Sequence, residues 1–344
     1  MKRNVILINL VCAALLFTWA TLPMAQEKKL VLISWGGVWE EGIKKAFGDP
    51  FEKETGIKMV YTGPYDLGKL KAMVEAGRVE WDLGQAGTGW IAQAEHSNLL
   101  EPIDYAVVKK EQLDAGAVHK FAVGGEYEAI AIGYRTDKYG KNPPKNWKDF
   151  WNPKAFTGPR CLPKRPDFTM EIALLADGVD PGKLYPLDID RAFKSLDRLK
   201  PNIPVWWTVG AQSQSVLKDG EVDMVATYNG RIIDLKVKGA PVDIVWDQAL
   251  YYQAAWFVVK GTPRKAEAMR FIEFSNRPEN QAIMAKHIYY GPTNPKAFQF
   301  IDRESAKNLP SYPEHFQKCV KLDFDYWRPN REKVLERMTQ WLMK

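Results

Sequence analysis

The stretch from Leu30 to Tyr61 constrains the fold more than any other part of the sequence. An apolar run of strand length, Leu30 to Ile33, is followed by the turn 34–37 and then by apolar residues at helical spacing. Gly56 ends the helical pattern, and residues 57–61 again have strand character. A strand, a helix and a second strand of these lengths predict a parallel pair with a crossover helix, which is the unit of an α/β fold.

The turn after the first strand is a candidate ligand site. Ligands of open α/β sheets bind at the carboxyl ends of strands, where helix amino ends present unpaired N–H groups. Gly36 and Gly37 would let a ligand approach the backbone, and Trp35 and Trp39 offer flat apolar surface beside it. The alternative is a structural turn whose tryptophans belong to the core.

Residues 1–25 have the pattern of an export signal, in which Lys2 and Arg3 precede an apolar run too short for a membrane span. Cleavage after Ala25 would leave 319 of the 344 residues and lower the net charge from +6 to about +4, although a rival small-x-small site at 18–20 leaves the cleavage position open. Mixed charge of this size does not indicate a nucleic-acid partner. We therefore expect a soluble, periplasmic protein of one large or two medium domains.

Two cysteines, Cys161 and Cys319, remain after this cleavage. Because export leads to an oxidising compartment, a disulfide between them and a pair of buried free thiols are both open at this stage.

Strand and helix patterns then alternate along the chain, and a change of character near 133–137 indicates a crossing between two lobes. The glycine-rich segment 84–90 has the form of a second strand-to-helix turn, but it lacks the spacing of a nucleotide-binding loop. Strands are predicted at 81–83, 127–134, 157–162, 204–207, 222–228, 242–246 and 253–259, and helices at 38–51, 65–77, 90–97, 167–176, 188–199, 211–218, 231–237, 264–275, 278–287 and 330–343.

Several stretches together resemble the extracellular solute-binding proteins of ABC importers, in the branch of the spermidine/putrescine-binding proteins. Their order and spacing over nearly the whole mature chain carry the likeness, at 51–58, 81–83, 131–134, 147–151, 220–224, 228–230, 239–246, 271–274 and 290–294.

This resemblance implies a periplasmic-binding-protein fold, in which two α/β lobes are joined by a hinge and hold the ligand in a cleft. It places an N-terminal lobe at 26–134 plus 257–305 and a C-terminal lobe at 135–256 plus 306–344. The implied partners are a small-molecule ligand and the membrane subunits of an ABC permease, and we expect a monomer that closes about its hinge.

The resemblance also carries over candidate ligand-binding residues by position. They are residues of the two turns and aromatic or basic side chains of the cleft, namely Trp35, Gly37, Trp39, Thr88, Arg165, Tyr228, Tyr252, Tyr290 and Arg328.

Departures from the polyamine-binding pattern bear on the ligand. Ala254 stands where an acid is expected, the segment 164–166 is basic where acids are expected, and Arg328 replaces a glutamine. Since a buried cation must be paired, this favours an anionic or zwitterionic solute, such as a carboxylate or an amino acid. A true polyamine binder remains the alternative if Asp167, Glu171 or Asp247 supplies the acid.

Other functions have weaker support in the sequence. The tyrosine pairs 251–252 and 289–290 could hold ferric iron, or could simply pack in the core. The four histidines lack metal-ligand spacing, and the motifs of serine hydrolases and zinc proteases are absent from the 344 residues. We therefore expect no catalytic activity, no resident metal and no cofactor.

Overall fold

The structure is a computed structural model that describes residues 28–344, so the predicted signal segment 1–25 lies outside the described residues. The described strands form one mixed sheet with the order β2-β1-β3-β9-β5-β8-β6-β7, and β4, β10 and β11 pair beside this path. Within the described residues, no helix has both the length and the apolar character that crossing a bilayer requires.

The first unit has the predicted form. Strands β1 (Lys29–Ile33) and β2 (Lys58–Thr62) pair in parallel, with Leu30 opposite Met59. The crossover between them is α1 (Gly37–Ile43), a π-helical turn (Lys44–Gly48) and α2 (Asp49–Thr55). Gly56 ends this helix in the left-handed conformation, at φ +69°, which glycine adopts without strain.

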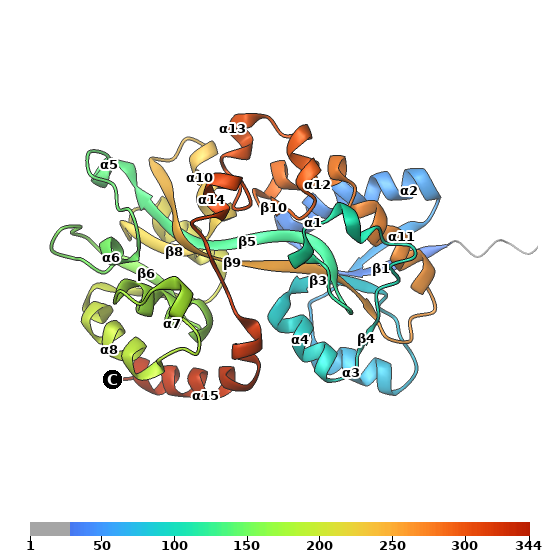
Figure 1. The fold of residues 1–344 in the computed structure, drawn as a ribbon, viewed down its shortest axis with the longest axis horizontal. Helices are drawn as coiled ribbons and strands as arrows, with labels where there is room; N and C mark the ends of the chain where they lie inside the picture. The colour runs from blue at the N-terminus through green and yellow to red at the C-terminus, as the bar shows by residue number, and fades with distance from the viewer. Residues whose placement is uncertain (1–27) are drawn as a thin grey trace, which may run out of the picture.

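Two long antiparallel strands, β5 (Val123–Arg135) and β9 (Val242–Val259), run through the whole molecule (Figure 1). One end of β9 pairs with β3 (Leu83–Gly87), and the far half of β5 pairs with β8 (Met224–Tyr228). The prediction of separate strands at 242–246 and 253–259 was wrong. A bulge at Gln248, with φ +58°, carries one strand through the polar residues between them.

Helices cover both faces of the sheet in each half of the molecule (Figure 1). Separate apolar cores lie in the two halves, one around Phe51 and Trp256 and the other around Trp147 and Trp327. This confirms the predicted two-lobed α/β fold, whereas the exact lobe boundaries stay a prediction. The helices of the first half are α3 (Leu67–Glu75), α4 (Thr88–His96), α11 (Lys265–Ser275) and α12 (Pro278–Ile288), and those of the second are α6 (Trp147–Phe150), α7 (Pro166–Ala176), α8 (Ile189–Leu199), α9 (Gly210–Lys218), α10 (Asn229–Val237) and α15 (Phe324–Leu342).

The remaining elements are short. They are β4 (Leu100–Glu101), α5 (Thr136–Tyr139), β6 (Arg160–Pro163), β7 (Val205–Trp207), β10 (Gly291–Pro292), α13 (Arg303–Ala306), α14 (Pro313–Phe316) and β11 (Val320–Lys321). The described residues also contain five 3₁₀ turns, at Lys110–Gln112, Ala115–Ala117, Pro181–Lys183, Lys200–Asn202 and Pro295–Phe300.

Two local predictions are corrected by the structure. Most of the glycine-rich segment 84–90 is strand β3, and α4 begins directly after it at Thr88. The last helix begins at Phe324, six residues before the predicted start, because Asp323 caps it by accepting a hydrogen bond from the Tyr326 N–H at 3.0 Å. Pro329 is accommodated inside this helix.

Cys161 and Cys319 are free thiols, so the disulfide left open by the sequence does not form. Cys161 is a residue of β6 and packs in the core with Trp207 and Val225, whereas Cys319 lies against the carbonyl of Trp246. Burial raises the pKa of each thiol to about 12, and neither is therefore a reactive thiolate at neutral pH.

The buried carboxylate of Asp82 holds the first lobe together. It accepts hydrogen bonds from the Val31 N–H at 2.6 Å, from the Thr262 hydroxyl and from the Arg264 Nε at 2.7 Å. We predict that Asp82→Asn lowers the free energy of unfolding by about 3 kcal/mol in urea titration, because Arg264 loses its charged partner.

Glu54→Gln is the matched control. Glu54 pairs with Arg277 at 2.8 Å, but half of its side chain is exposed to solvent. Its loss should cost no more than about 1 kcal/mol. Equal effects of the two substitutions would contradict the role given to Asp82.

Candidate ligand-binding site

The floor of the candidate site is one face of the sheet where it passes between the lobes. Register places Gly87 of β3 opposite Ala254 of β9, and Ala254 opposite Glu126 of β5. The next row on the same face pairs Tyr252 with Glu128. Gly87 and Ala254 are small, so the floor is deep at this point, and a cavity of about 550 Å³ lies above it.

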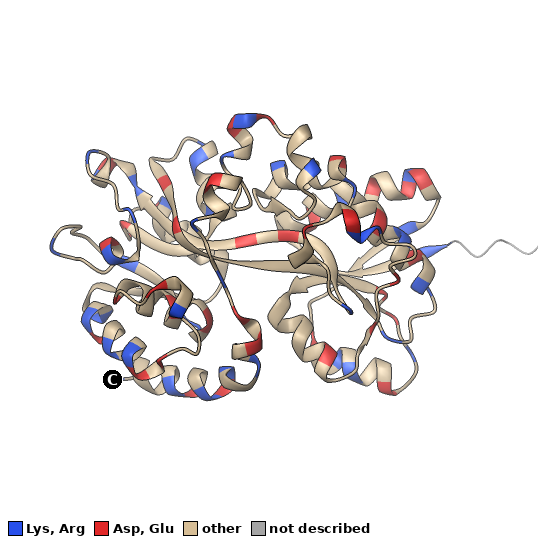
Figure 2. Ribbon diagram, in the orientation of Figure 1, with Lys and Arg blue, Asp and Glu red and all other residues tan. Residues whose placement is uncertain are grey.

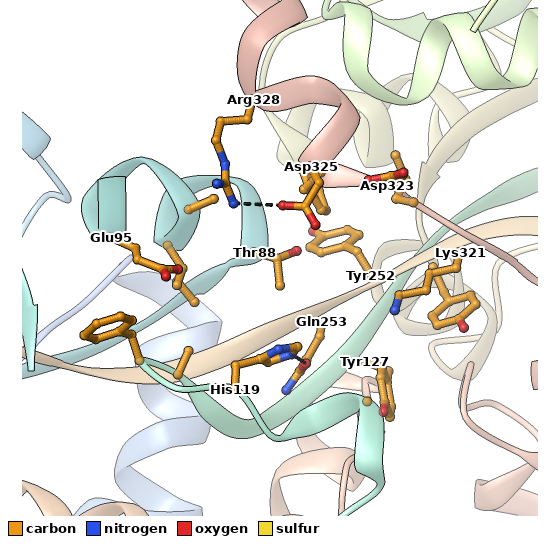
Figure 3. A pocket seen from close by; sticks show the side chains of 18 of the residues that line it. Thr88, Glu95, His119, Tyr127, Tyr252, Gln253, Lys321, Asp323, Asp325 and Arg328 are labelled. Atoms are coloured by element: carbon orange, nitrogen blue, oxygen red, sulfur yellow. Dashed lines mark hydrogen bonds and ion pairs between the residues drawn. The ribbon is translucent and has the colours of Figure 1, made fainter. Parts of the chain in front are cut away.

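Seven of the nine predicted binding residues line this cavity. They are Trp35, Trp39, Arg165, Tyr228, Tyr252, Tyr290 and Arg328. Gly37 is not among the lining residues, and its φ of +58° accounts for a glycine there as a requirement of the turn. Thr88 lines an adjoining cavity of about 960 Å³ (Figure 3). The two cavities share Tyr252, Phe324 and Arg328.

The tryptophan turn forms one end of the smaller cavity. Trp35 stacks on Tyr65 with ring centroids 4.0 Å apart, and its Nε1 donates to the Gln85 carbonyl at 3.1 Å. Trp39 donates from Nε1 to Glu126 Oε1 at 3.1 Å. Both rings are thus held in place by β3 and β5, while 55% of Trp35 remains exposed. The turn therefore presents ordered aromatic surface to the cavity.

Glu128 is a lining residue that the sequence reasoning missed. Its Oε2 accepts a hydrogen bond from the Tyr252 hydroxyl at 2.6 Å. Desolvation raises the pKa of Glu128 to about 7, although Tyr252, Arg165, Arg231 and Tyr290 all act in the opposite direction. Figure 2 shows acidic residues on β5 between the lobes, where Glu126 and Glu128 belong.

A sequence signal for Glu128 did exist. Glu126 and Glu128 are two residues apart in an otherwise apolar strand, and side chains at that spacing share one face. Glu126 is 4% exposed, and burial with the nearby Glu128 charge raises its pKa to about 8.

Arg165 comes from the segment that joins β6 to α7. It forms an ion pair with Asp167, and its guanidinium lies 4.6 Å from the centre of the Phe168 ring. Asp167 is buried and also lies 3.3 Å from Arg331 Nε. Phe168 adopts φ +80°, a rare conformation for a residue with a side chain, and this shapes the start of α7 around the ion pair.

Two further arginines line the cavity. Arg231, in the first turn of α10, donates to Gln214 Oε1 at 3.3 Å, and it is a second residue that sequence reasoning missed. Arg328 donates to Asp325 Oδ1 at 2.8 Å and points across the adjoining cavity (Figure 3). Counting Arg331, four arginines but only two acids, Glu128 and Asp167, line the smaller cavity.

Asn229 and Gly230 help to position the tyrosines that line the cavity, which are Tyr228, Tyr252 and Tyr290. Asn229 accepts from the Ala129 N–H at 3.0 Å and donates to the Tyr289 carbonyl at 2.6 Å, which ties β5, α10 and the Tyr290 loop together. A side chain at Gly230 would place its first carbon 2.5 Å from the Ile288 carbonyl oxygen. Desolvation raises the pKa of Tyr252 and Tyr290 well above the usual value, so both phenols stay protonated and can donate hydrogen bonds.

The other acids considered for a polycation are committed elsewhere or lie outside the cavity. Glu171 is buried and accepts from the Trp327 indole at 2.5 Å, the Tyr185 hydroxyl at 2.8 Å and the Phe168 N–H at 3.0 Å. Asp247 is not among the residues that line the cavity.

The iron hypothesis fits this geometry poorly. Tyr251 and Tyr252 are neighbours on a strand and point to opposite faces, so the sequence pair does not act as one unit. Among residues 28–344, His, Cys, Asp and Glu side chains do not come together in a group of three or more that could hold a metal ion.

Comparison with known proteins agrees with the fold. Residues 46–316 match the family model of bacterial extracellular solute-binding proteins. The gamma-aminobutyric acid (GABA)-binding protein of Pseudomonas aeruginosa is 35% identical, with 94% of this chain and 93% of the relative covered. The spermidine/putrescine-binding periplasmic protein of Escherichia coli is 24% identical, over 80% and 82% of the two chains.

A solved structure of the Atu4243 GABA receptor superposes with a TM-score of 0.85 at 39% identity, covering 91% of this chain and 97% of the other. The resemblance to ABC solute-binding proteins is therefore confirmed. The chain belongs to the family of bacterial extracellular solute-binding proteins, which capture small solutes for ABC importers.

Proposed function

We propose that this protein captures a small zwitterion of the ω-amino-acid class in the periplasm and delivers it to an ABC permease. The observation that carries the proposal is the pairing, in one cavity, of a single uncommitted acid with several arginines. Glu128 is that acid, and Arg165 and Arg231 are close enough to lower its pKa.

The arginines suit a carboxylate. Guanidinium groups bind carboxylates through paired N–H donors, and this interaction is strong where water is excluded. Arg231 has only a neutral side-chain partner, Gln214, so its charge is available to a ligand. Arg165 lines the same cavity but shares its charge with Asp167. We therefore assign Arg231 the main contact with the carboxylate and Arg165 a supporting one.

Glu128 and the tyrosines suit an ammonium group. A buried ammonium requires a charged partner, and electron-rich ring faces add a further attraction. Hydrogen bonds from Tyr252 and Tyr290 both lower the pKa of Glu128, and Tyr228 lines the same cavity. A ligand that carries both an ammonium group and a carboxylate can then contact Glu128 and an arginine of the same cavity at once.

A polyamine fits less well. It carries at least two ammonium groups, whereas Asp167 is already paired with Arg165 and lies beside Arg331, which leaves Glu128 as the acid for both. The position of Ala254 supplies no charge. The higher identity to a GABA-binding protein than to a spermidine/putrescine-binding protein supports the same choice.

Transport, rather than catalysis, is the role that this proposal assigns. The relatives are solute-binding proteins, and the aromatic cavity offers binding groups without an activated nucleophile. The protein would act as a monomer that exchanges its ligand with the permease subunits.

Calorimetry with GABA tests the proposal directly. Saturable binding without product is expected, and GABA at one hundred times its dissociation constant should stabilise the fold by about 2.7 kcal/mol. Spermidine and succinate serve as competing classes. Strong binding of spermidine with no binding of GABA would overturn the zwitterion assignment in favour of the polyamine alternative.

Truncated ligands separate the two ends of the site. We predict that Glu128→Gln weakens GABA and n-butylamine about 10- to 100-fold but leaves butyrate unchanged, because the variant loses only the partner of the ammonium group. Arg231→Gln should weaken GABA and butyrate but not n-butylamine. Glu75→Gln, at the exposed end of α3 and away from both cavities, controls for the change of charge. Loss of all three ligands with either variant would contradict the assignment of ends.

Binding should also depend on pH through Glu128. Because its pKa is raised to about 7, the group is largely protonated below pH 7, and an ammonium ligand must displace that proton. We predict that GABA affinity falls about tenfold per pH unit below pH 7 and levels off above it. Glu128→Gln should remove this dependence, and a pH profile unchanged by the substitution would assign the titration to another group.

A further inference from the structure

Two glycines of the segment 84–90, Gly87 and Gly89, leave room for aromatic rings. Gly87 has an ordinary φ of −61°, and Gly89 lies in the first turn of α4, where glycine is less stable than alanine. A first side-chain carbon at Gly87 would lie 3.3 Å from the Tyr252 ring, and one at Gly89 would lie 2.8 Å from the Phe324 ring. Space, rather than backbone conformation, therefore explains the absence of side chains at both positions.

Phe324 reaches the first lobe from the second. It is the first residue of α15, which packs against α4, and its ring lies beside Gly89. The ring also packs edge-on against Tyr252 of β9, with ring centroids 5.7 Å apart. The chain before it is tied to β9, because the Leu322 N–H donates to the Tyr251 carbonyl at 3.0 Å. Phe324 is thus fixed between the two lobes.

The Tyr252 ring is enclosed by these contacts. Gly87 lies on one side of it, the Phe168 ring lies with its centroid 5.7 Å away, and Phe324 closes the side of α15. The Tyr252 hydroxyl donates to Glu128 Oε2 at 2.6 Å, and this bond favours the ionised form of Glu128 by lowering its pKa. Loss of the Phe324 ring would leave a gap into which the Tyr252 ring can turn away from Glu128.

We propose that Phe324 is a positioning residue, which fixes the Tyr252 ring so that its hydroxyl stays on Glu128. The role rests on the proposed zwitterion site, and it adds a determinant of the end that holds the ammonium group. Because the Phe324 ring lies between Gly89 of the first lobe and Tyr252, this end of the site is complete only where α15 lies against α4.

Calorimetry with GABA, n-butylamine and butyrate tests this role. Phe324→Leu removes the ring but keeps an apolar side chain, and we expect it to weaken GABA and n-butylamine about tenfold while butyrate stays within about twofold. Gly89→Ala should have the same effect, because its methyl carbon would displace the Phe324 ring although alanine favours the helix. Phe121→Leu is the matched control. Phe121 lines the adjoining cavity but not the smaller one, so all three affinities should stay unchanged.

A double-mutant cycle distinguishes positioning of Tyr252 from a general disturbance of the fold. Tyr252→Phe removes the hydroxyl on which Phe324 is proposed to act. In that background, Phe324→Leu should change the affinity for n-butylamine by less than about twofold, because the bond through which it acts is already lost. Additive effects of the two substitutions would show that Phe324 acts by another route and would overturn the proposal.

The outcomes also separate this role from the proposed function. If the native protein does not bind GABA, the zwitterion site fails, and the positioning role fails with it. If GABA binds with the predicted sensitivity to Arg231→Gln but Phe324→Leu and Gly89→Ala behave like the control, only the positioning role is wrong. It is also wrong if both variants lose butyrate as strongly as n-butylamine. If Phe324→Leu does not fold, Gly89→Ala decides by the same criteria.

Discussion

The antiparallel pairing of β5 with β9 is the constraint on which the rest of the structure depends. These two strands belong to both lobes, and every other described strand except β1, β2, β6 and β7 pairs with β5 or β9. Because the ladder is continuous between the lobes, residues from distant parts of the chain come into register on one face. Glu128, Tyr252, Ala254 and Gly87 form the floor of the site for this reason alone.

Electrostatics decides what that floor can hold. Glu128 is an acid in a poorly solvated position, and its high pKa reflects the cost of ionising it without a cationic ligand. The arginines around it reduce this cost without forming an ion pair with it. Asp167, by contrast, is neutralised by Arg165 and lies beside Arg331. The cavity therefore has one acid with arginine partners, Asp167, and one acid that can pair with a ligand, Glu128. This difference argues for a ligand with one ammonium group rather than two.

Sequence reasoning located much of the aromatic part of the site and two of its arginines, Arg165 and Arg328, but it missed Glu128 and Arg231. Trp35 and Trp39 follow a strand and open a helix, so their place at the carboxyl edge of the sheet follows from local pattern. Tyr228, Tyr252 and Tyr290 were found through resemblance over the whole chain. Glu128 and Arg231 had only weak local signals, because an acid in a strand and a basic residue in the first turn of a helix are also common on surfaces. Thr88 shows the opposite error, since it follows the same strand as Gly87 yet points into the adjoining cavity.

The sequence by itself determined the α/β class, the first parallel unit and the order of most helices, because these depend on periodicity, caps and turn residues within a few neighbours. It also determined the family, because short motifs recur in a specific order. Only the tertiary structure decided that β9 is one strand, that the cysteines stay apart, and that Glu128 and Arg231 line the same cavity. Those outcomes depend on strand register and on burial, which arise from contacts between residues more than a hundred positions apart.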